Sequence, residues 1–411
     1  MVATLIWVYS VMFFFGIYFL LLFVVLYMRN KEKLNEFPPI TKEYSVSIVI
    51  PCFNAEKEIG ETIKNLLKTK YSQLKQIIVV GDCSTDNSYN VIKEYADKYE
   101  NVLLVKTPKN TGCAAGAKNY GAKFAETDLI GFSDDDSRPL SDAVEKMIGY
   151  FDEKKVAAVT SCVMVQNKKN FMERFQDIDY KVIAWSRKVM DFIGCVYVTN
   201  GPLSIYRRDA FEKVGRFDEK NMTEDIEVTW NLLSRGYETR MSYAAKVFTI
   251  VPKKLGVWIR QRVRWNVGGL QTLYKYRKTF LSKGENLFSN FVMSYVALSF
   301  ILALFGFFLF LRYVYLRAGK YVLAIPYIFK GYNPFAFSEF YFPVTILFIL
   351  GMAFLALSIY YHKIALKSFG SKGKGIWTIL TYIFIYRPLY TIPLIASFYK
   401  LAKRDIGWYT K

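Results

Sequence analysis

The sequence of 411 residues contains a single histidine, His362. One histidine excludes zinc and di-iron sites that need several histidine ligands. It also argues against a Ser-His-Asp or Cys-His nucleophile, because His362 lies in a strongly apolar part of the sequence. If the protein is an enzyme, carboxylates must therefore carry its acid–base and metal-binding chemistry.

Several common functional motifs are also missing. The five cysteines have no CxxC spacing, which excludes zinc ribbons and dithiol redox motifs. No GxxxxGK[ST] occurs, and no GxGxxG follows the first short apolar run, so a P-loop ATPase is excluded and a dinucleotide-binding fold is disfavoured. The cysteines all lie in the polar central region, where we expect reduced thiols of a cytosolic domain. They are Cys52, Cys83, Cys113, Cys162 and Cys195.

Acidic residues are scarce in this chain. It has 35 Asp and Glu against 55 Lys and Arg, which gives a formal net charge of +20. No RNP or zinc-finger pattern accompanies this charge, so we do not expect nucleic acid as a partner. Attraction to anionic membrane lipids, together with binding of a phosphorylated substrate, explains the charge instead.

Long apolar runs are abundant, and a hydrophobic content of 53% is too high for a disordered chain. Residues 4–28 form an uncharged apolar run, and about 20 such residues suffice to cross a bilayer. A signal peptide is disfavoured because the run is long and lacks both a basic region before it and a cleavage site after it. The basic cluster Arg29–Lys33 follows, so the positive-inside tendency places the polar region in the cytosol of a plasma membrane protein.

The C-terminal part, residues 287–400, predicts about two to four membrane spans or re-entrant segments. The last apolar run is ambiguous because Arg387-Pro388 lies at its centre, where a charge is costly and proline breaks the helix. The predicted parts are spans at Phe288–Leu311 and Tyr341–Tyr361, a straight or kinked segment at Ile376–Tyr399, an interfacial loop or surface helix at Tyr313–Phe340, and a basic tail at 401–411.

The central region alternates short apolar runs with helical patterns. The runs Val46–Pro51, Gln76–Val80 and Asp128–Phe132 are bounded by polar turn residues, and helical patterns at Glu56–Leu67 and Asn87–Tyr99 separate them. This alternation predicts an α/β fold with a doubly wound, mostly parallel sheet. In such sheets ligands bind beyond the carboxyl ends of the strands, so the polar residues that follow each run are candidate site residues.

Three consecutive carboxylates, Asp134, Asp135 and Asp136, follow the third run. On an extended strand end, residues i and i+2 point the same way, so we expect Asp134 and Asp136 to converge and Asp135 to turn aside. Carboxylates with phosphate oxygens and water suit Mg²⁺ or Mn²⁺. A solvated acidic turn is the alternative interpretation, and the position at a strand end favours the metal site.

A second acidic pair, Glu224 and Asp225, follows Thr223, which we expect to cap a helix. Acidic residues in a first turn also complement the helix dipole, so the pair alone does not indicate catalysis. Since the chain has no usable histidine, a carboxylate must supply any general base, and Asp225 is well placed for this role.

The third signal is QRVRW at Gln261–Trp265, in a window from Pro252 to Lys278 with eight basic and no acidic residues. One interpretation of residues 252–286 is a set of basic amphipathic helices on anionic lipid. Another is binding of a diphosphate, which the arginine fork suits. The two interpretations are compatible. The apolar stripe expected to face lipid consists of Ile259, Val263, Val267, Leu270 and Tyr274.

Together these features resemble the membrane-embedded processive family 2 glycosyltransferases, such as cellulose, chitin, hyaluronan and poly-N-acetylglucosamine synthases. The resemblance covers about residues 45–275. Its motifs are VSIVIPCFNAEKEI, IIVVGDCSTDNS with Asp82 at the second Asp of the family's pair, the DxD at Asp134–Asp136, NGPLS, TED and a complete QxxRW. It implies a cytosolic nucleotide-diphospho-sugar transferase domain of the GT-A type at residues 30–250, flanked by transmembrane helices.

The resemblance also implies roles for residues. Asp225 would be the catalytic base, and Asp134 and Asp136 would bind Mg²⁺ or Mn²⁺ as the cofactor. Residues implied to bind the donor are Pro51, Phe53, Asn54, Asp82, Asp134, Asp135, Asp136, Gln261, Arg262 and Arg264, and those implied to bind the acceptor are Gly201, Pro202, Glu224 and Trp265.

The implied function is that of a hexosyltransferase. It would move sugar from a UDP-sugar donor, with inversion and metal dependence, to a growing β-linked polysaccharide at the cytosolic membrane face, with export and oligomerisation left open. One alternative is a non-processive transferase that makes a glycolipid from a membrane lipid acceptor. A non-catalytic scaffold or channel component is disfavoured, because it would not need Asp134, Asp136, Asp225 and QRVRW together.

Overall fold

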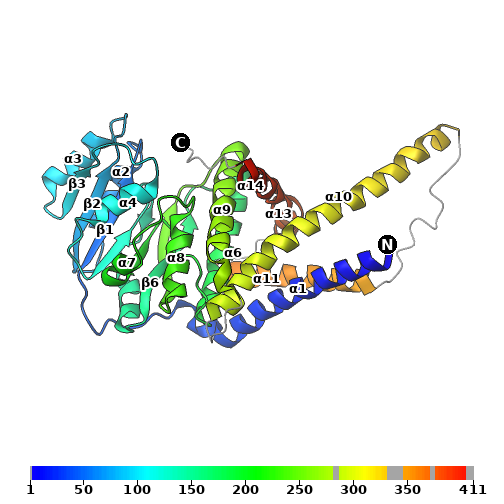
Figure 1. Ribbon diagram of the computed structural model, residues 1–411, viewed down its shortest axis with the longest axis horizontal. Helices are drawn as coiled ribbons and strands as arrows, with labels where there is room; N and C mark the ends of the chain where they lie inside the picture. The colour runs from blue at the N-terminus through cyan, green and yellow to red at the C-terminus, as the bar shows by residue number, and fades with distance from the viewer. Residues whose placement is uncertain (1, 281–286, 331–345, 371–374, 404–411) are drawn as a thin grey trace. The chain divides into compact units, whose positions relative to one another are not determined.

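The computed structural model describes residues 2–280, 287–330, 346–370 and 375–403 (Figure 1). The chain divides into two compact units. We call Leu26–Ser294 with Ala396–Lys411 the sheet unit, and Met1–Val25 with Tyr295–Ile395 the helical unit.

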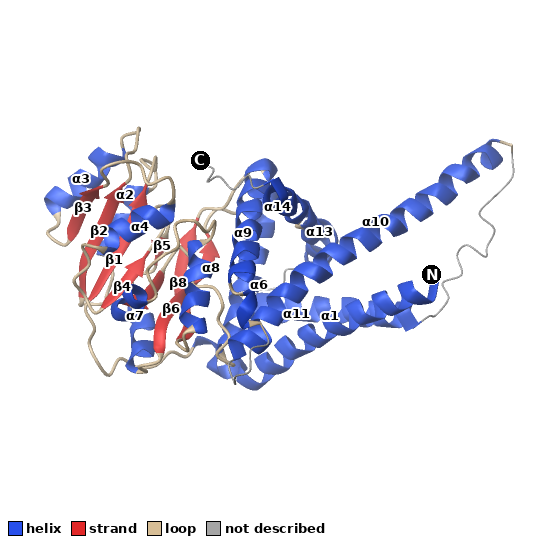
Figure 2. Ribbon diagram, viewed as in Figure 1, coloured by secondary structure: helices blue, strands red, loops and turns tan. Residues whose placement is uncertain are grey.

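The sheet unit is built on one eight-stranded sheet with the order β3-β2-β1-β4-β7-β6-β8-β5 (Figure 2). Four of its seven strand pairings are parallel and three are antiparallel. The predicted parallel order is therefore present around β1, whereas β7 and β5 make the rest of the sheet mixed. The strands are β1 (Val46–Cys52), β2 (Leu74–Gly81), β3 (Val102–Lys106), β4 (Leu129–Phe132), β5 (Arg138–Pro139), β6 (Val156–Val165), β7 (Ser204–Arg207) and β8 (Glu238–Thr249).

The central strands are apolar on both sides because helices cover both faces of the sheet. Along β1, Ile48 belongs to the hydrophobic cluster on one face and Val49 to the cluster on the other, as the alternation of side chains along a strand requires. The first cluster includes Ile63 of α2, and the second includes Ala117 of α4. A continuous Val and Ile run is therefore the pattern of a strand buried on both faces.

The helices of the sheet unit follow the strands in the α/β order. The longest, α6 and α9, lie against each other, where Arg262 of α9 pairs with Asp179 of α6 at 3.4 Å. Asn170 and Glu173 form a capping box that fixes the start of α6. The helices are α2 (Ile59–Leu67), α3 (Ser88–Lys98), α4 (Ala114–Ala122), α5 (Glu145–Ile148), α6 (Phe171–Asp191), α7 (Arg208–Lys213), α8 (Glu224–Ser234) and α9 (Leu255–Lys275), with shorter turns η1 (Lys31–Asn35), η2 (Gly149–Asp152), η3 (Arg277–Thr279) and η4 (Phe288–Val292).

The expectation that the apolar stripe of α9 faces lipid is wrong for its buried part. Val263 and Val267 are 6% and 3% exposed and pack with Met222. Ala396 and Leu401, which follow the helical unit in the sequence, pack against the same cluster. Protein therefore covers this side of α9. Val263 and Val267 of the stripe are apolar because they are buried inside the sheet unit.

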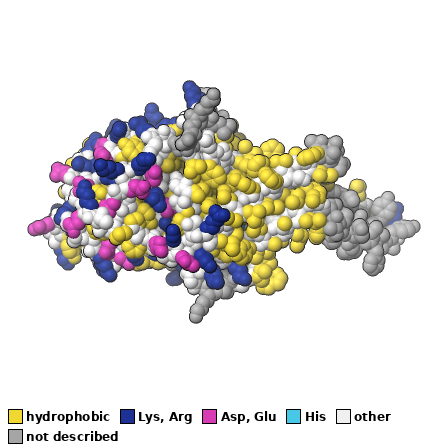
Figure 3. All heavy atoms as spheres, turned by 90° about the horizontal axis from the view of Figure 1, so that it is seen from below, with side chains coloured by type: hydrophobic (Ala, Val, Ile, Leu, Met, Phe, Trp, Pro, Cys, Tyr) yellow, Lys and Arg dark blue, Asp and Glu magenta, His cyan; other side chains and the backbone are white. Residues whose placement is uncertain are grey.

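The helical unit consists of long apolar helices. Four helices of the described chain are long and apolar enough to cross a membrane: Ile6–Asn35, Phe288–Leu316, Ile346–Lys367 and Ile376–Lys403. Figure 3 shows hydrophobic side chains over these helices and charged side chains scattered over the sheet unit. The helices are α1 (Val2–Asn30), α10 (Met293–Phe329), α11 (Ile346–Lys367), α12 (Ile376–Thr381), α13 (Arg387–Leu389) and α14 (Thr391–Lys403), with a π-helical turn, η6, at Tyr382–Tyr386.

Aromatic side chains join the helices of this unit. The ring of Phe23 on α1 lies 6.0 Å from that of Tyr295 on α10 and 5.9 Å from that of Tyr361 on α11. The neighbouring His362 is buried, with Nδ1 2.7 Å from the Ser358 carbonyl oxygen of its own helix. The single histidine is thus a packed helix residue.

Two predicted segments of the C-terminal part differ from the structure. We expected the span that begins at Phe288 to end at Leu311, but α10 continues to Phe329. The rest of the predicted interfacial segment, and the first residues of the span predicted at Tyr341, lie outside the described residues. The last segment is helical but interrupted, with η6 before Arg387 and a turn at Tyr390.

Candidate active site

A cavity of about 600 Å³ opens at the carboxyl ends of β1, β2 and β4 in the sheet unit. It is lined by thirteen of the fifteen residues that the sequence singles out. These are Pro51, Phe53, Asp82, Asp134, Asp135, Asp136, Gly201, Pro202, Glu224, Asp225, Gln261, Arg264 and Trp265. The structure thus brings together residues that are more than 200 positions apart in the sequence, which places them without assigning their roles.

The acidic triplet lies in a turn, because β4 ends at Phe132. The Ser137 amide donates to the Asp134 carbonyl oxygen at 3.2 Å, and Thr62 Oγ1 donates to the Asp135 carbonyl oxygen at 2.7 Å. The alternation of an extended strand does not apply to a turn. Our reason for expecting Asp135 to turn aside therefore does not apply, and all three residues line the cavity.

The NGPLS segment lies against the triplet at Gly201. A Cβ on Gly201 would lie 2.5 Å from Asp134 Oδ2, so a larger residue here would force the Asp134 carboxylate to move. The following Pro202 accepts a hydrogen bond from Ser133 Oγ at 2.8 Å through its carbonyl oxygen. The NGPLS segment is thus held directly against the triplet.

A buried lysine that the sequence analysis missed connects the two acidic clusters. Lys118 Nζ lies 3.2 Å from Asp134 Oδ1 and 2.9 Å from Glu224 Oε1. Burial lowers the pKa of Lys118, but the charges of Glu224 and Asp134 outweigh burial and hold the pKa above its ordinary value. Lys118 is the one charged residue of α4 in a run of alanine and glycine, which is the signal that could have found it.

Glu224 and Asp225 begin α8, with Thr223 at the N-cap position. The prediction that Thr223 caps the helix is wrong in detail, because its side chain makes no capping hydrogen bond. Its hydroxyl instead donates to Asn221 Oδ1 at 3.4 Å. Asp225 Oδ1 accepts a hydrogen bond from the Ile226 amide at 2.9 Å, which holds the carboxylate at the start of the helix.

The environment separates the pKa values of these two carboxyl groups. Burial raises the pKa of Glu224, but the charge and hydrogen bond of Lys118 outweigh it and hold the pKa below its ordinary value. Burial and then the charge of Glu224 raise the pKa of Asp225 to about 6. Two neighbouring carboxyl groups with separated pKa values are the usual pattern of acid–base sites. At neutral pH, Asp225 is ionised but can accept a proton readily.

The QRVRW motif presents three of its side chains to the cavity. Gln261, Arg264 and Trp265 are three and four positions apart on one face of α9 and line the cavity. Arg262, which we expected to bind the donor, is not among the lining residues. It is 2% exposed, pairs with Asp179 and lies 3.8 Å from the ring centroid of Trp265. Because it turns towards α6, its expected contact with the donor is wrong, and it supports Trp265 from behind.

Asn54 is the second predicted donor residue that does not line the cavity. Its backbone has a positive φ of 52°, and its Oδ1 accepts hydrogen bonds from the Thr85 amide and hydroxyl at 2.8 and 3.2 Å. These bonds connect the loops that follow β1 and β2. Asn54 therefore fixes the wall of the cavity from outside it.

Asp82 lines the cavity, but its carboxylate is already engaged. It accepts hydrogen bonds from the hydroxyls of Thr107 and Thr111, both at 2.7 Å, and from the Thr111 amide at 3.0 Å. The loop that leads from β3 to α4 is thereby held at the cavity. The predicted contact between Asp82 and a nucleobase stays a prediction.

The cavity also contains residues of α6 and of the loop after it that no motif marked. Tyr180, Ile183, Ala184 and Arg187 come from α6, and Tyr197 follows it. Arg187 Nη1 donates to Asn200 Oδ1 at 2.5 Å. These residues occupy inner positions of an ordinary amphipathic helix, so the sequence gives no separate signal for them.

Asp134 and Asp136 fit a divalent metal whose remaining ligands come from the substrate and water. The described residues contain no cluster of three His, Cys, Asp or Glu side chains that could hold a metal alone. Magnesium typically takes one or two carboxylates, with substrate phosphates and water for the rest. Asp134 and Asp136 supply hard oxygen donors at the cavity wall, so they fit such an ion together with a diphosphate.

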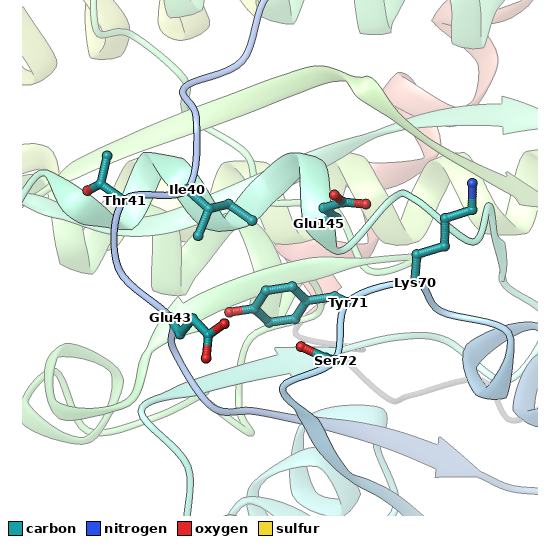
Figure 4. Close-up of a pocket in the computed structure, with 7 residues that line it drawn as sticks. All are labelled: Ile40, Thr41, Glu43, Lys70, Tyr71, Ser72 and Glu145. Carbon is teal, nitrogen blue, oxygen red and sulfur yellow. The ribbon is translucent and has the colours of Figure 1, made fainter.

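A second cavity of about 310 Å³ lies near the start of the sheet unit (Figure 4). Tyr71 in its wall donates to the Tyr44 carbonyl oxygen at 2.8 Å, which is a structural contact. None of the residues predicted from the sequence lines this cavity, so the larger cavity is the candidate active site. The residues drawn are Ile40, Thr41, Glu43, Lys70, Tyr71, Ser72 and Glu145.

Comparison with known families gives a match over the first part of the sheet unit. Residues 47–215 match the family described as Glycosyl transferase family 2. This range contains the acidic triplet, Lys118 and the NGPLS segment, and it ends before α8 and α9. The predicted resemblance to family 2 glycosyltransferases is thereby confirmed for this range of residues.

Curated relatives extend the similarity further along the chain. A poly-beta-1,6-N-acetyl-D-glucosamine synthase from Staphylococcus aureus (strain COL) is 30% identical over 268 residues, and its counterpart from Staphylococcus epidermidis is 27% identical. Each match covers 64% of this chain and 64% of the relative, just under two thirds of the relatives' length.

Among solved structures, the chain is similar to a mannosyltransferase from Pyrobaculum calidifontis in complex with GDP-Man and Mn2+. The TM-score is 0.60 at 16% sequence identity, and the match covers 97% of this chain and 99% of that one. At this identity the similarity concerns the fold alone. It confirms the predicted fold class of a GT-A domain with apolar helices.

Proposed function

We propose that this chain, whose residues 47–215 match the glycosyl transferase family 2 model, is a hexosyltransferase that extends a β-linked polysaccharide from a UDP-sugar. The observation that carries the proposal is the cavity in which Asp225, with a pKa raised to about 6, shares the walls with the acidic triplet and QRVRW. The similarity to polysaccharide synthases supports the choice of acceptor.

The proposed reaction is a single displacement with inversion. An acceptor hydroxyl attacks the anomeric carbon of the donor, and Asp225 takes the hydroxyl proton as the new bond forms. The bond between that carbon and the diphosphate breaks, and the diphosphate leaves with the electron pair. Burial and the charge of Glu224 raise the affinity of Asp225 for the proton, and the charge of Lys118 partly opposes them.

Arg264 and the acidic triplet would handle the diphosphate. Arginine binds phosphate through two parallel hydrogen bonds, and Arg264 projects into the cavity from α9. Asp134 and Asp136 would hold Mg²⁺ or Mn²⁺, which supplies positive charge to the leaving diphosphate. Gln261 would add a polar contact to the donor, and Trp265 a flat face for an acceptor sugar. Pro51 and Phe53 would contact the nucleobase.

The membrane setting is part of the proposal. The four apolar helices and the basic residues that follow the first of them favour an integral protein of the plasma membrane with the cavity in the cytosol. Membrane lipids would surround these helices. The polymer would be exported if it passes through this protein or through an oligomer of it.

Transfer to a membrane lipid is the competing candidate, since the unpaired Arg187 in the cavity would suit an acceptor phosphate. The two candidates differ in their products. A processive polymerase makes long chains, whereas a lipid transferase adds one sugar per acceptor.

The test uses the full chain purified in detergent. UDP-glucose, UDP-N-acetylglucosamine and UDP-glucuronate would each be supplied with Mn²⁺, and donor consumption and product length would be measured. We expect long product from at least one donor and loss of UDP binding when EDTA removes the metal. No donor consumption with any sugar would overturn the proposed function, and UDP binding of equal strength without metal would overturn the metal assignment.

A further inference from the structure

Arg187 is a cation in the active-site cavity without a carboxylate partner. It lies in the last turns of α6 and donates one hydrogen bond, from Nη1 to Asn200 Oδ1 at 2.5 Å. No carboxylate of the described residues lies within 4.0 Å of its guanidinium. The group lines the cavity beside apolar side chains, Ile183 and Ala184, and beside Tyr197.

Several other buried or half-buried cations of the sheet unit form ion pairs with carboxylates. A charge removed from water is costly, and proteins ordinarily offset the cost with a paired charge. Lys118 has two carboxylate partners within 3.2 Å, and four further buried or half-buried cations each have at least one. These are Lys181 with Asp177, Lys188 and Arg240 with Asp191, and Arg262 with Asp179. Arg187 has no such carboxylate partner among the described residues, and it lines the cavity, where a ligand could supply one.

Arg187 lies further along α6 than Tyr180. On the same helix, Tyr180 lies close enough to Asp134 and Asp136 for their charges to raise its pKa, after the larger effect of burial. Arg187 is two turns further along, about 10 Å at 1.5 Å per residue. Burial lowers the pKa of Arg187, and Tyr197 and Asp225 oppose that effect. The charge of Asp225 thus acts on Arg187, whereas those of Asp134 and Asp136 act on Tyr180.

We propose that Arg187 binds a carboxylate or phosphate group of the substrate, distinct from the donor diphosphate, beside the reacting hydroxyl. This rests on the proposed function and narrows its substrate class. The group would come from one of two sources: a uronic acid as the transferred or accepting sugar, or the phosphate of a lipid acceptor. A guanidinium fork suits either anion, and the apolar walls strengthen the contact by excluding water.

The first test measures binding without turnover. The full chain in detergent would be saturated with UDP and Mn²⁺ and titrated with two pairs of probes, farnesyl phosphate against farnesol and glucuronate against glucose. We expect at least one anionic probe to bind about 10- to 100-fold more tightly than its neutral analogue, as a charged hydrogen-bonded contact predicts. The pair that shows the preference identifies the source.

Three variants make the result specific. Arg187→Gln should abolish the preference, Arg187→Lys should keep part of it, and Arg174→Gln, an exposed arginine of the same helix, should keep all of it. UDP affinity should change by less than about threefold in Arg187→Gln. No preference in the wild type, a preference that survives Arg187→Gln, or a tenfold loss of UDP affinity in that variant would each overturn the proposal.

A stability measurement distinguishes binding from a structural role. An unpaired buried charge does not stabilise the fold, so the melting temperature of ligand-free Arg187→Gln should equal or exceed that of the wild type. A clear decrease would mean that Arg187 holds the fold. The transfer assay remains separate, because absence of donor turnover would overturn the proposed function while the preference for anions could still be observed.

Discussion

At the scale of single residues, the site depends on charges placed so that one carboxyl group differs from its neighbour. Glu224 is held ionised by Lys118, whereas Asp225, one position later, has its pKa raised to about 6. Both side chains end in a carboxyl group, and their pKa values differ because Lys118 forms an ion pair with Glu224 and not with Asp225. Activity should therefore depend on pH through Asp225.

We predict that Asp225→Asn lowers turnover by about 10²- to 10⁴-fold while UDP binding is unchanged, because asparagine keeps the shape but cannot take a proton. In the wild type, turnover should fall as the pH drops below about 6, where Asp225 becomes protonated. Rates measured between pH 5 and 8 check both statements. A loss of less than tenfold would exclude Asp225 as the base.

The same pKa makes a prediction about stability. The ordinary pKa of aspartate is about 3.9, so between pH 4 and 6 the folded protein holds a proton that the unfolded chain has released. The fold thus loses stability as the pH rises through this window. Asp225→Asn should therefore melt higher than the wild type at pH 7 and show no such gain at pH 4.

We predict that Lys118→Met destabilises the protein by about 3–5 kcal/mol, because it leaves the buried carboxylate of Glu224 without its partner. Lys118 also lowers the pKa of Asp225, so its removal should move the acidic limb of the pH–rate profile to higher pH. Lys118→Arg keeps the charge and serves as the control. An unmoved limb in Lys118→Met would separate Lys118 from the base.

At the scale of elements, the position of α9 depends on a close approach to the start of α8. A Cβ on Gly268 would lie 2.7 Å from the Thr223 nitrogen, which is backbone and cannot swing aside. Gly268 lies on the same helix as Arg264 and Trp265 and packs next to the acidic pair that begins at Glu224. The distance between Asp225 and QRVRW therefore depends on a residue with no side chain.

We predict that Gly268→Ala lowers both the melting temperature and turnover, because the helix must shift and Trp265 moves with it. Gly256→Ala on the same helix is the control, since no atom lies within 4 Å of its added methyl group. That variant should be neutral or slightly stabilising, as alanine favours helix. Equal behaviour of the two variants in thermal melts and transfer assays would contradict this account.

The elements also show where sequence reasoning succeeds and fails. The run Val46–Pro51 predicts the strand β1 (Val46–Cys52), because strands buried on both faces are continuously apolar. The strand β7 has four residues and β5 has two, too few for any periodicity to appear, so the mixed half of the sheet was missed. The triplet was found by composition, but its geometry was wrong because a turn does not alternate.

The contacts of single charged residues could not be predicted from the sequence. Arg262 and Arg264 are identical by type and two positions apart, yet one pairs with Asp179 and the other lines the cavity. A helix turns by about 100° per residue, and the sequence alone does not tell which face meets which neighbour. Arg187 carries no motif at all, and its unpaired charge is visible only after the fold has assembled.

At the scale of the whole molecule, the sheet unit is discontinuous in sequence. The chain leaves it at Ser294 and returns at Ala396. The returning segment packs against Val263 and Val267, and Ser397 Oγ donates to the Val263 carbonyl oxygen at 3.3 Å. Residues that follow the helical unit therefore support the helix that carries QRVRW.

We predict that Leu401→Ala costs about 1–2 kcal/mol of stability, less than for a fully buried leucine, because Leu401 is only partly buried against the cluster around Val263. Tyr399→Ala on the same helix is the control, since Tyr399 is 59% exposed. Thermal melts in detergent compare the two. Turnover should fall in the first variant and not in the second, and the reverse order would contradict the supporting role.

The segment that returns to the sheet unit at Ala396 affects when the protein can fold during its synthesis. Domains generally fold as units as the ribosome releases them, the N-terminal part first. Here the packing around Val263 is completed by Leu401, which lies near the end of the last apolar helix and is translated after the other three. A nascent chain would hold the transferase motifs long before it could assemble them. Catalysis would begin only once all four apolar helices had been synthesised and Leu401 had packed against Val263.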